Sequence, residues 1–92
     1  IIYLGDTMNL KQIFEQNVKY YRFKKHYTQE KLANLINTSP KYISRLELGQ
    51  HNPSLDMVER IATALNVEPD KLFSKVGKIS LPDRVNMVTK GE

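Results

Sequence analysis

The sequence has 92 residues, 40% hydrophobic and 26% charged, which suits one domain and is too short for two. It contains no cysteine, which excludes a disulfide scaffold and a thiolate metal site and is compatible with the cytoplasm, where we expect the protein. No apolar run approaches the roughly 18 residues of a membrane span, so no membrane association is expected.

The positive charge is concentrated in one half of the predicted core. The net charge is +4, a weak sign of a polyanion partner by itself. Residues 10–52 carry eight Lys and Arg against three Glu, a balance of +5, whereas residues 53–73 balance at −2. This polarity is typical of a polyanion-binding face backed by a neutral support, although an unevenly charged solvated surface would look the same.

The first two predicted elements are amphipathic helices. Over 10–25, apolar residues recur at three- and four-residue steps, at Leu10, Ile13, Phe14, Val18 and Tyr21. A second helix is predicted over 28–36, where Thr28 can act as N-cap and Glu30 favours the positive end of the helix dipole. Its inner face is predicted to carry Leu32, Ala33 and Ile36.

The third predicted helix begins at Ser39-Pro40, a capping residue followed by a proline that fits the first helical position. It directs Ile43 and Leu46 inward and ends at Gly49, a natural residue after a helix C-terminus.

A fourth helix starts at Ser54 and can close at Asn66, with an apolar face formed by Leu55, Val58, Ile61, Ala62 and Leu65. A fifth, short turn opens at Pro69 and is anchored by Leu72 and Phe73. No segment alternates convincingly with a period of two. The sequence therefore predicts an all-α fold, a compact five-helix domain.

The predicted domain covers 10–73. Residues 1–9 are interpreted as an N-terminal extension, and a start at Met8 would place 1–7 outside the native chain. Residues 74–92 are interpreted as a C-terminal tail or linker, with a role in dimerisation or partner binding as the alternative.

The second and third helices are joined by a very short turn. Ala33 allows the helices to cross closely, and Asn37 tolerates the left-handed conformation that the reversal needs. This arrangement is typical of a helix-turn-helix, whose second helix can enter the major groove of DNA.

Residues 29–46 resemble the helix-turn-helix of the phage repressor and Cro-type family, the XRE family of bacterial regulators. The matching residues are Gln29, Leu32, Ala33, Asn37, Ile43 and Leu46. The resemblance extends through 27–33, like "TQxxLA", 42–49, like "YISRxExG", 52–55, like "NPSL", and 70–73, like "DELF". Asn37 departs from the usual glycine.

The resemblance implies that the third helix reads bases in double-stranded DNA. The residues that map onto its reading face are Ser39, Pro40, Lys41, Ser44 and Arg45. Arg45 can donate two parallel hydrogen bonds to guanine, and Pro40 can contact a thymine methyl group.

Phosphate contacts are expected from Gln29, Tyr42, Gln50, His51, Asn52, Arg22 and Lys24. Gln29 begins a helix, where backbone amides and dipole favour an anion. The resemblance also implies a partly buried ion pair between Arg22 and Glu47.

The predicted function is a sequence-specific transcriptional regulator, a repressor, that binds a two-fold operator as a homodimer. Leu72, Phe73 or the flanking segments are candidates for the dimer seam. The alternatives are an antitoxin, with 74–92 contacting a protein partner, or a restriction-modification controller protein. No catalytic constellation, metal-ligand group or cofactor motif is visible, so we expect no enzyme, no metal and no cofactor.

Overall fold

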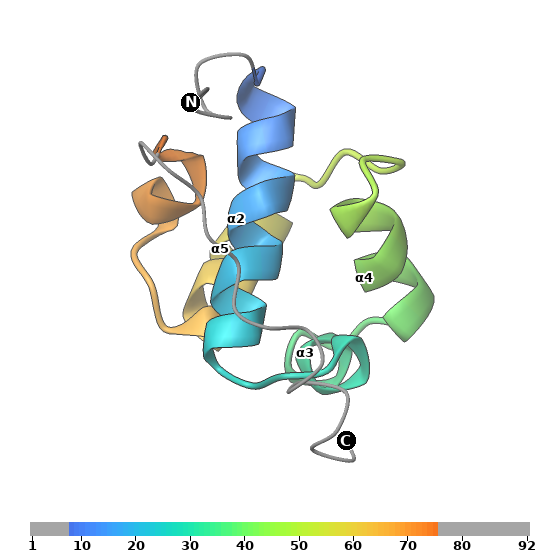
Figure 1. Cartoon of the computed structure of the whole chain (residues 1–92). Helices are drawn as coiled ribbons and strands as arrows, with labels where there is room; N and C mark the ends of the chain where they lie inside the picture. Colours follow the sequence, from blue (N-terminus) through green and yellow to red (C-terminus); the bar gives the residue numbers. More distant parts are fainter. Residues whose placement is uncertain (1–7, 76–92) are drawn as a thin grey trace.

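The computed structural model describes residues 8–75, which form four α-helices and one 3-10 helix (Figure 1). These are α2 (Leu10–Lys24), α3 (Gln29–Leu35), α4 (Pro40–Glu47), α5 (Leu55–Leu65) and η1 (Pro69–Phe73). The described part contains no strand, which agrees with the predicted all-α class. The expectations for 1–7 and 76–92 lie outside the described residues.

The expectation of five α-helices is wrong in its last member. The segment after Pro69 is a 3-10 helix, in which the amide of Lys71 donates to the carbonyl of Glu68 and that of Ser74 to Lys71. Five residues are too few to develop a run of α-helical hydrogen bonds, so the tighter i→i+3 pattern is used.

Each of the four described α-helices begins at a polar side chain that accepts a hydrogen bond from its first turn. Thr28 and Ser39 cap α3 and α4 as predicted, and Ser54, where the fourth helix was expected to start, caps α5. The cap of α2 is Asn9, which forms a reciprocal capping box with Gln12. These local bonds determine where the helices start, independently of the core.

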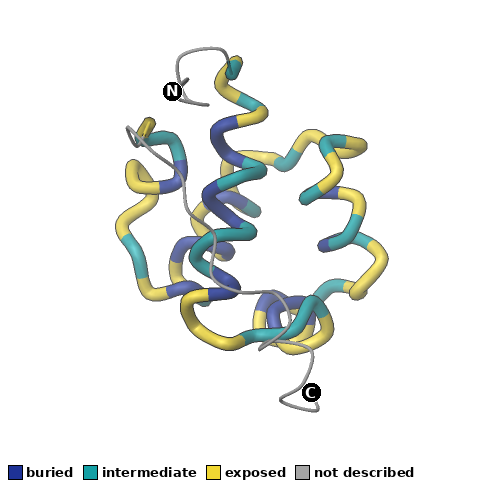
Figure 2. The backbone as a smooth tube through the Cα atoms, viewed as in Figure 1, coloured by how far each residue is buried: buried dark blue, intermediate teal, exposed yellow. Residues whose placement is uncertain are grey.

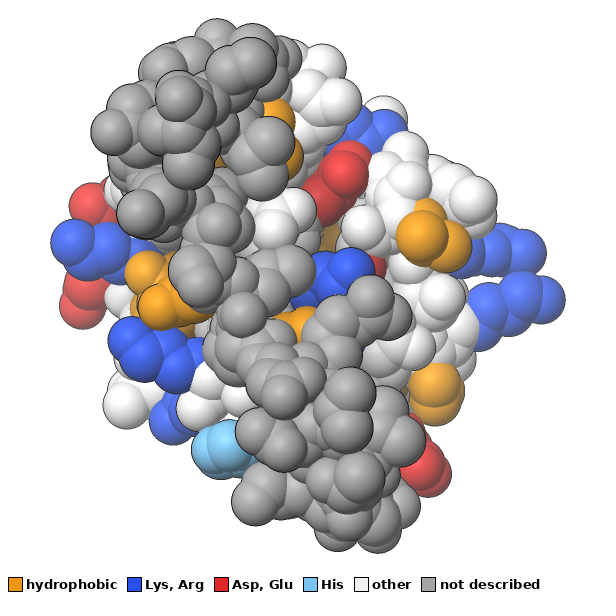
Figure 3. Space-filling view, in the orientation of Figure 1, with side chains coloured by type: hydrophobic (Ala, Val, Ile, Leu, Met, Phe, Trp, Pro, Cys, Tyr) orange, Lys and Arg blue, Asp and Glu red, His pale blue; other side chains and the backbone are white. Residues whose placement is uncertain are grey.

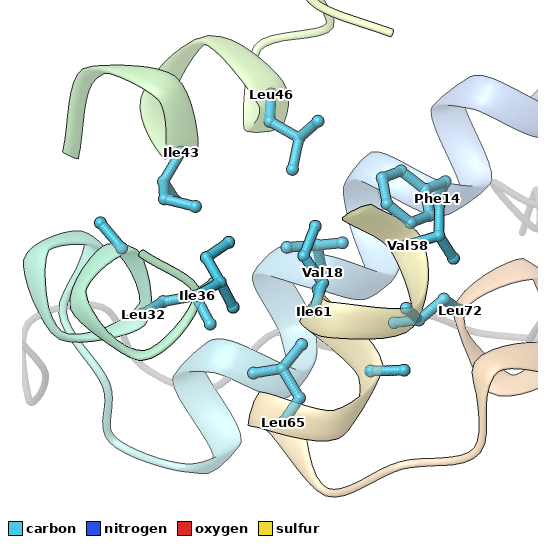
Figure 4. Close-up of a cluster of buried hydrophobic side chains, with 12 residues drawn as sticks. Phe14, Val18, Leu32, Ile36, Ile43, Leu46, Val58, Ile61, Leu65 and Leu72 are labelled. Atoms are coloured by element: carbon cyan, nitrogen blue, oxygen red, sulfur yellow. The ribbon is translucent and has the colours of Figure 1, made fainter. Parts of the chain in front are cut away.

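The helices surround one apolar core. α2 passes through the middle of the molecule, with α4 on one side and η1 on the other, and it contacts both (Figure 1). Side chains from all five elements meet in the cluster drawn in Figure 4, where Ile43 and Leu46 point inward from α4. Leu32, Ile43, Leu46, Ile61 and Leu72 are fully buried.

Two leucines assigned to apolar faces lie outside this core. Leu10 is 62% exposed and Leu55 is 82% exposed. Each is the first residue of its helix, one turn before the packed part of the apolar stripe, so the periodic pattern continues beyond the contact. Figure 2 shows that the start of α2 is exposed and that buried residues begin further along the helix.

A buried polar residue connects α2 to η1. The side-chain amide of Asn17 donates to the carbonyl of Leu72 at 2.9 Å and to that of Ser74 at 3.1 Å. Phe73 stacks on Phe14 with ring centroids 5.3 Å apart. Leu72 is fully buried and so offers no surface for the dimer seam, whereas Phe73, the other candidate, is half-buried beside this stack. Among the described residues, no helix is long and apolar enough to cross a membrane.

Candidate nucleic-acid interface

The turn between α3 and α4 places the two helices at close quarters. Asn37 adopts a left-handed conformation, with a φ of 62°, as the chain reversal requires. The amide of Thr38 donates to the carbonyl of Ala33 at 2.8 Å, which closes the end of α3. Ala33 is fully buried, and its small side chain allows the backbone of α4 to approach.

The inner and outer faces of α4 are sharply different. Ile43 and Leu46 have no exposed surface. Four of the five predicted base-reading residues, Ser39, Pro40, Lys41 and Arg45, are exposed, and Ser44 is half-buried. Figure 3 shows Lys and Arg side chains projecting from the edge of the molecule on which α4 lies in Figure 1. The fold therefore presents the predicted base-reading residues to solvent on one helix.

Ser39 has a structural role as well as an exposed position. Its hydroxyl oxygen accepts a hydrogen bond from the amide of Tyr42 at 3.1 Å. This bond orients the first turn of α4 and leaves the hydroxyl proton free to donate outward.

The ion pair between Arg22 and Glu47 is present in the structure and deeply buried. Arg22 Nε donates to Glu47 Oε2 at 2.7 Å and Nη2 donates to Oε1 at 3.0 Å, while Nη1 donates to the carbonyl of Tyr27 at 2.9 Å. The two side chains are only 7% and 4% exposed. All three guanidinium nitrogens donate within this network, so the phosphate contact expected of Arg22 would have to use one of the two remaining N–H groups.

Glu47 also holds Gln29, the residue expected to contact phosphate at the start of α3. Gln29 Nε2 donates to Glu47 Oε1 at 3.1 Å. One of the two Nε2 protons satisfies the carboxylate and the other can point to solvent. The network Arg22–Glu47–Gln29 therefore connects α2, α3 and α4 and sets the position of the amide.

The loop after α4 carries the other predicted phosphate contacts. Gln50, His51 and Asn52 are all exposed. His51 packs edge-on against Tyr42, with ring centroids 4.7 Å apart. Tyr42 is half-buried against the core, and burial raises the pKa of its phenol while the charge of Arg60 lowers it.

Gly49 begins this loop in a left-handed conformation, with a φ of 77°. This backbone conformation favours glycine, and a Cβ added there would lie 2.6 Å from a carboxylate oxygen at the flexible end of Glu15, which would have to move. Burial raises the pKa of Glu15, and nearby Lys11 lowers it. The contact between α2 and the loop was not predicted.

Lys24 lies at the exposed end of α2, with its ammonium over the ring of Tyr20, 5.6 Å from the centroid. His26 follows the helix in a left-handed conformation with a φ of 61°. No group of His, Cys, Asp or Glu able to hold a metal ion occurs within residues 8–75.

Sequence comparison assigns the chain to a family. Residues 18–72 match the family model described as helix-turn-helix. The chain belongs to this helix-turn-helix family. The resemblance to the phage repressor and Cro-type regulators, drawn from the motifs of α3 and α4, is confirmed.

Named relatives cover most of the chain. The control protein C.BamHI of Bacillus amyloliquefaciens is 40% identical over 77% of this chain and 91% of its own length. The restriction-modification controller protein C.AhdI from Aeromonas hydrophila is 40% identical, with a TM-score of 0.63 over 65% of this chain and 87% of that one. A hypothetical transcription factor from Neisseria has a TM-score of 0.70 and 28% identity over 73% and 77%.

Proposed function

We propose that this helix-turn-helix transcription regulator reads double-stranded DNA with the outer face of α4 in the major groove. The observation that carries the proposal is the separation of the faces of α4: Ile43 and Leu46 are fully buried, while Lys41 and Arg45 are exposed. An α-helix fits the major groove, and an exposed arginine can form bidentate hydrogen bonds to guanine.

The phosphate backbone is proposed to lie along the residues that flank α4. Gln29 is held at the start of α3 by Glu47, and the exposed loop 50–52 follows α4 directly. Lys24 supplies an outer cation. Such contacts position the protein on the duplex without reading sequence. Arg22 holds Glu47 in place within the fold, because its guanidinium donates to the Glu47 carboxylate and to the carbonyl of Tyr27.

A homodimer on a two-fold operator is proposed because one module of this size reads only a short half-site. With Leu72 buried in the core and Phe73 half-buried beside it, the seam is proposed to involve Leu48 and Leu55, which are 65% and 82% exposed and flank the loop 49–54. We expect Leu48→Lys/Leu55→Lys to sediment as a monomer at concentrations where the wild type is dimeric.

The more specific candidate is a restriction-modification controller protein, a cytoplasmic regulator of its own operon. It is supported by the names of C.BamHI and C.AhdI, each 40% identical to this chain. A gene for a nuclease or a methyltransferase beside this one is expected. The antitoxin hypothesis depends on the segment 74–92, most of which lies outside the described residues.

The test is binding to the protein's own upstream DNA and to a scrambled duplex at several salt concentrations. Wild type is expected to prefer the upstream duplex, and non-specific binding is expected to fall more steeply with salt. Arg45→Ala and Lys41→Ala should reduce this preference, whereas Lys71→Ala, which removes an exposed cation of η1, should not. Equal binding of both duplexes by the wild type would contradict the proposal.

A further inference from the structure

We propose that Arg60 of α5 is a positioning residue for DNA reading: it holds the turn between α3 and α4 and thereby the direction of α4, without contacting DNA. Nothing in the sequence patterns marked this residue, which lies between Glu59 and the apolar Ile61 on a helix assigned to the support. The inference rests on the proposed function, because a positioning role has meaning only if α4 reads bases.

The main observation is a hydrogen bond across the fold. Arg60 Nη2 donates to the carbonyl of Ile36, the residue that caps the C-terminus of α3. The last carbonyls of an α-helix have no amide partner within the helix and need another donor. Here the donor comes from 24 residues further along the chain, on a different helix.

The bonded carbonyl lies at the point where the direction of α4 is decided. Ile36 directly precedes the left-handed Asn37, and α4 starts at Pro40. A small change of backbone angle at 36–38 would swing the whole of α4, so a tether on this carbonyl limits that swing. The side chain of Ile36 packs in the apolar core and the residue is only 2% exposed, whereas its carbonyl is held by Arg60.

The element that carries Arg60 is itself well anchored. α5 is capped by Ser54 at one end and closed by the left-handed Asn66 at the other. Its inner residues Ile61, Ala62 and Leu65 are at most 1% exposed. Arg60 lines a groove of about 500 Å³ between α3 and α5 with Leu35, Ile36, Glu59, Thr63 and Ala64.

A second observation connects Arg60 with α4. The charge of Arg60 lowers the pKa of Tyr42, against the larger raising effect of burial, so the guanidinium lies within electrostatic reach of that phenol. Tyr42 packs on the core one residue after Lys41 and three before Arg45. Arg60 therefore acts near both the start of α4 and its first turn.

A loosened turn should affect base reading more than phosphate binding. Bidentate contacts to bases need side chains held to within roughly 0.5 Å, whereas phosphate contacts tolerate displacement. Loss of one aligned contact corresponds to about tenfold in discrimination. Arg60 is thus expected to influence the ratio of specific to non-specific affinity.

The experiment compares full-length wild type, Arg60→Met, Arg60→Lys and the charge control Lys71→Met. Each is titrated with the upstream and the scrambled duplex at one salt concentration, and folding is checked by circular dichroism and thermal unfolding. Arg60→Met is expected to reduce the ratio of the two affinities about tenfold. Lys71→Met should leave the ratio unchanged, and Arg60→Lys, which retains a donor and the charge, should restore part of it.

A ratio in Arg60→Met equal to that of the wild type would overturn the inference while leaving the proposed function intact. If both affinities also fall equally, Arg60 is an ordinary phosphate contact. If only the melting temperature falls, the bond is purely structural. A wild type without preference would instead contradict the proposed function itself.

Discussion

α4 and α5 are built on the same plan but present different charge to solvent. Both begin at a serine N-cap, and both bury an apolar stripe in the same core. The exposed charges of α4 are Lys41 and Arg45, whereas those of α5 are Asp56, Glu59 and Arg60. The shared features account for folding, and the difference between the outer faces accounts for which helix can approach a polyanion.

The glutamates of the two helices also differ in their exposure to solvent. Glu47 of α4 is turned inward and paired with Arg22, so it does not oppose the cations outside. Glu59 of α5 remains exposed. A positive outer face on α4 is thus obtained by burying its one carboxylate and compensating it with a charge from α2.

The largest expected effect follows from this buried carboxylate. Glu47→Ala would strand the guanidinium of Arg22 in a site where it is 7% exposed, and should cost about 3–5 kcal/mol of unfolding free energy. Glu59→Ala, on the surface of α5, should change it by less than about 0.5 kcal/mol. Urea denaturation of both variants measures the difference, and equal values would contradict the buried pair.

The double variant Arg22→Met/Glu47→Leu removes both charges at once. It should recover much of the loss, because the penalty in the single variant comes from the unpaired charge. If it is as unstable as Glu47→Ala, the loss reflects packing and not electrostatics.

The two serine caps allow a matched test of intermediate size. Ser39→Ala and Ser54→Ala should each reduce stability by about 1 kcal/mol, because each removes one acceptor for a helix amide. Only Ser39→Ala should also weaken discrimination between the upstream and scrambled duplexes. An equal loss of discrimination in Ser54→Ala would show that general stability, and not the outer face of α4, limits DNA reading.

The smallest expected effect concerns Glu15 of α2, whose carboxylate lies beside Gly49 in the loop that joins α4 and α5. Burial raises the pKa of Glu15 above its ordinary value of 4.5, so ionisation is easier in the unfolded chain. Stability is then greatest below that value and declines as the pH rises through it toward the folded pKa. Glu15→Gln should therefore gain stability relative to the wild type as the pH rises from 3 to 7. A gain that grows toward low pH would contradict the raised pKa of the partly buried Glu15 carboxylate.

Much of the fold could be predicted because its signals are local. Thr28 and Ser39 are caps and Asn37 is left-handed, as predicted, and α5 is bounded by Ser54 and Asn66, the residues at which it was expected to start and close. Leu10 and Leu55 were misassigned because periodicity does not show where a neighbouring helix ends. The 3-10 geometry of η1 depends on its length and on its packing against α2, which residue types do not reveal.

In the candidate site, too, local features could be predicted from the sequence, whereas contacts between distant residues could not. The exposure of Lys41 and Arg45 follows from the helical period once Ile43 and Leu46 are placed inside. The Arg22–Glu47 pair was expected from family resemblance, since its members are 25 residues apart. Asn17 and Arg60 were missed because the carbonyls that they bind lie 55 and 24 residues away. A polar residue on an otherwise apolar face was the signal available for Asn17.

The central claim is that the outer face of α4, and not that of α5, lies against DNA. Amide chemical-shift mapping during titration of the labelled protein with its upstream duplex tests this most directly. The account predicts that the largest shifts cluster at 39–45, at 50–52 and at Gln29, with small shifts at Asp56, Glu59 and Thr63. Large shifts along the outer face of α5, with α4 unaffected, would contradict it.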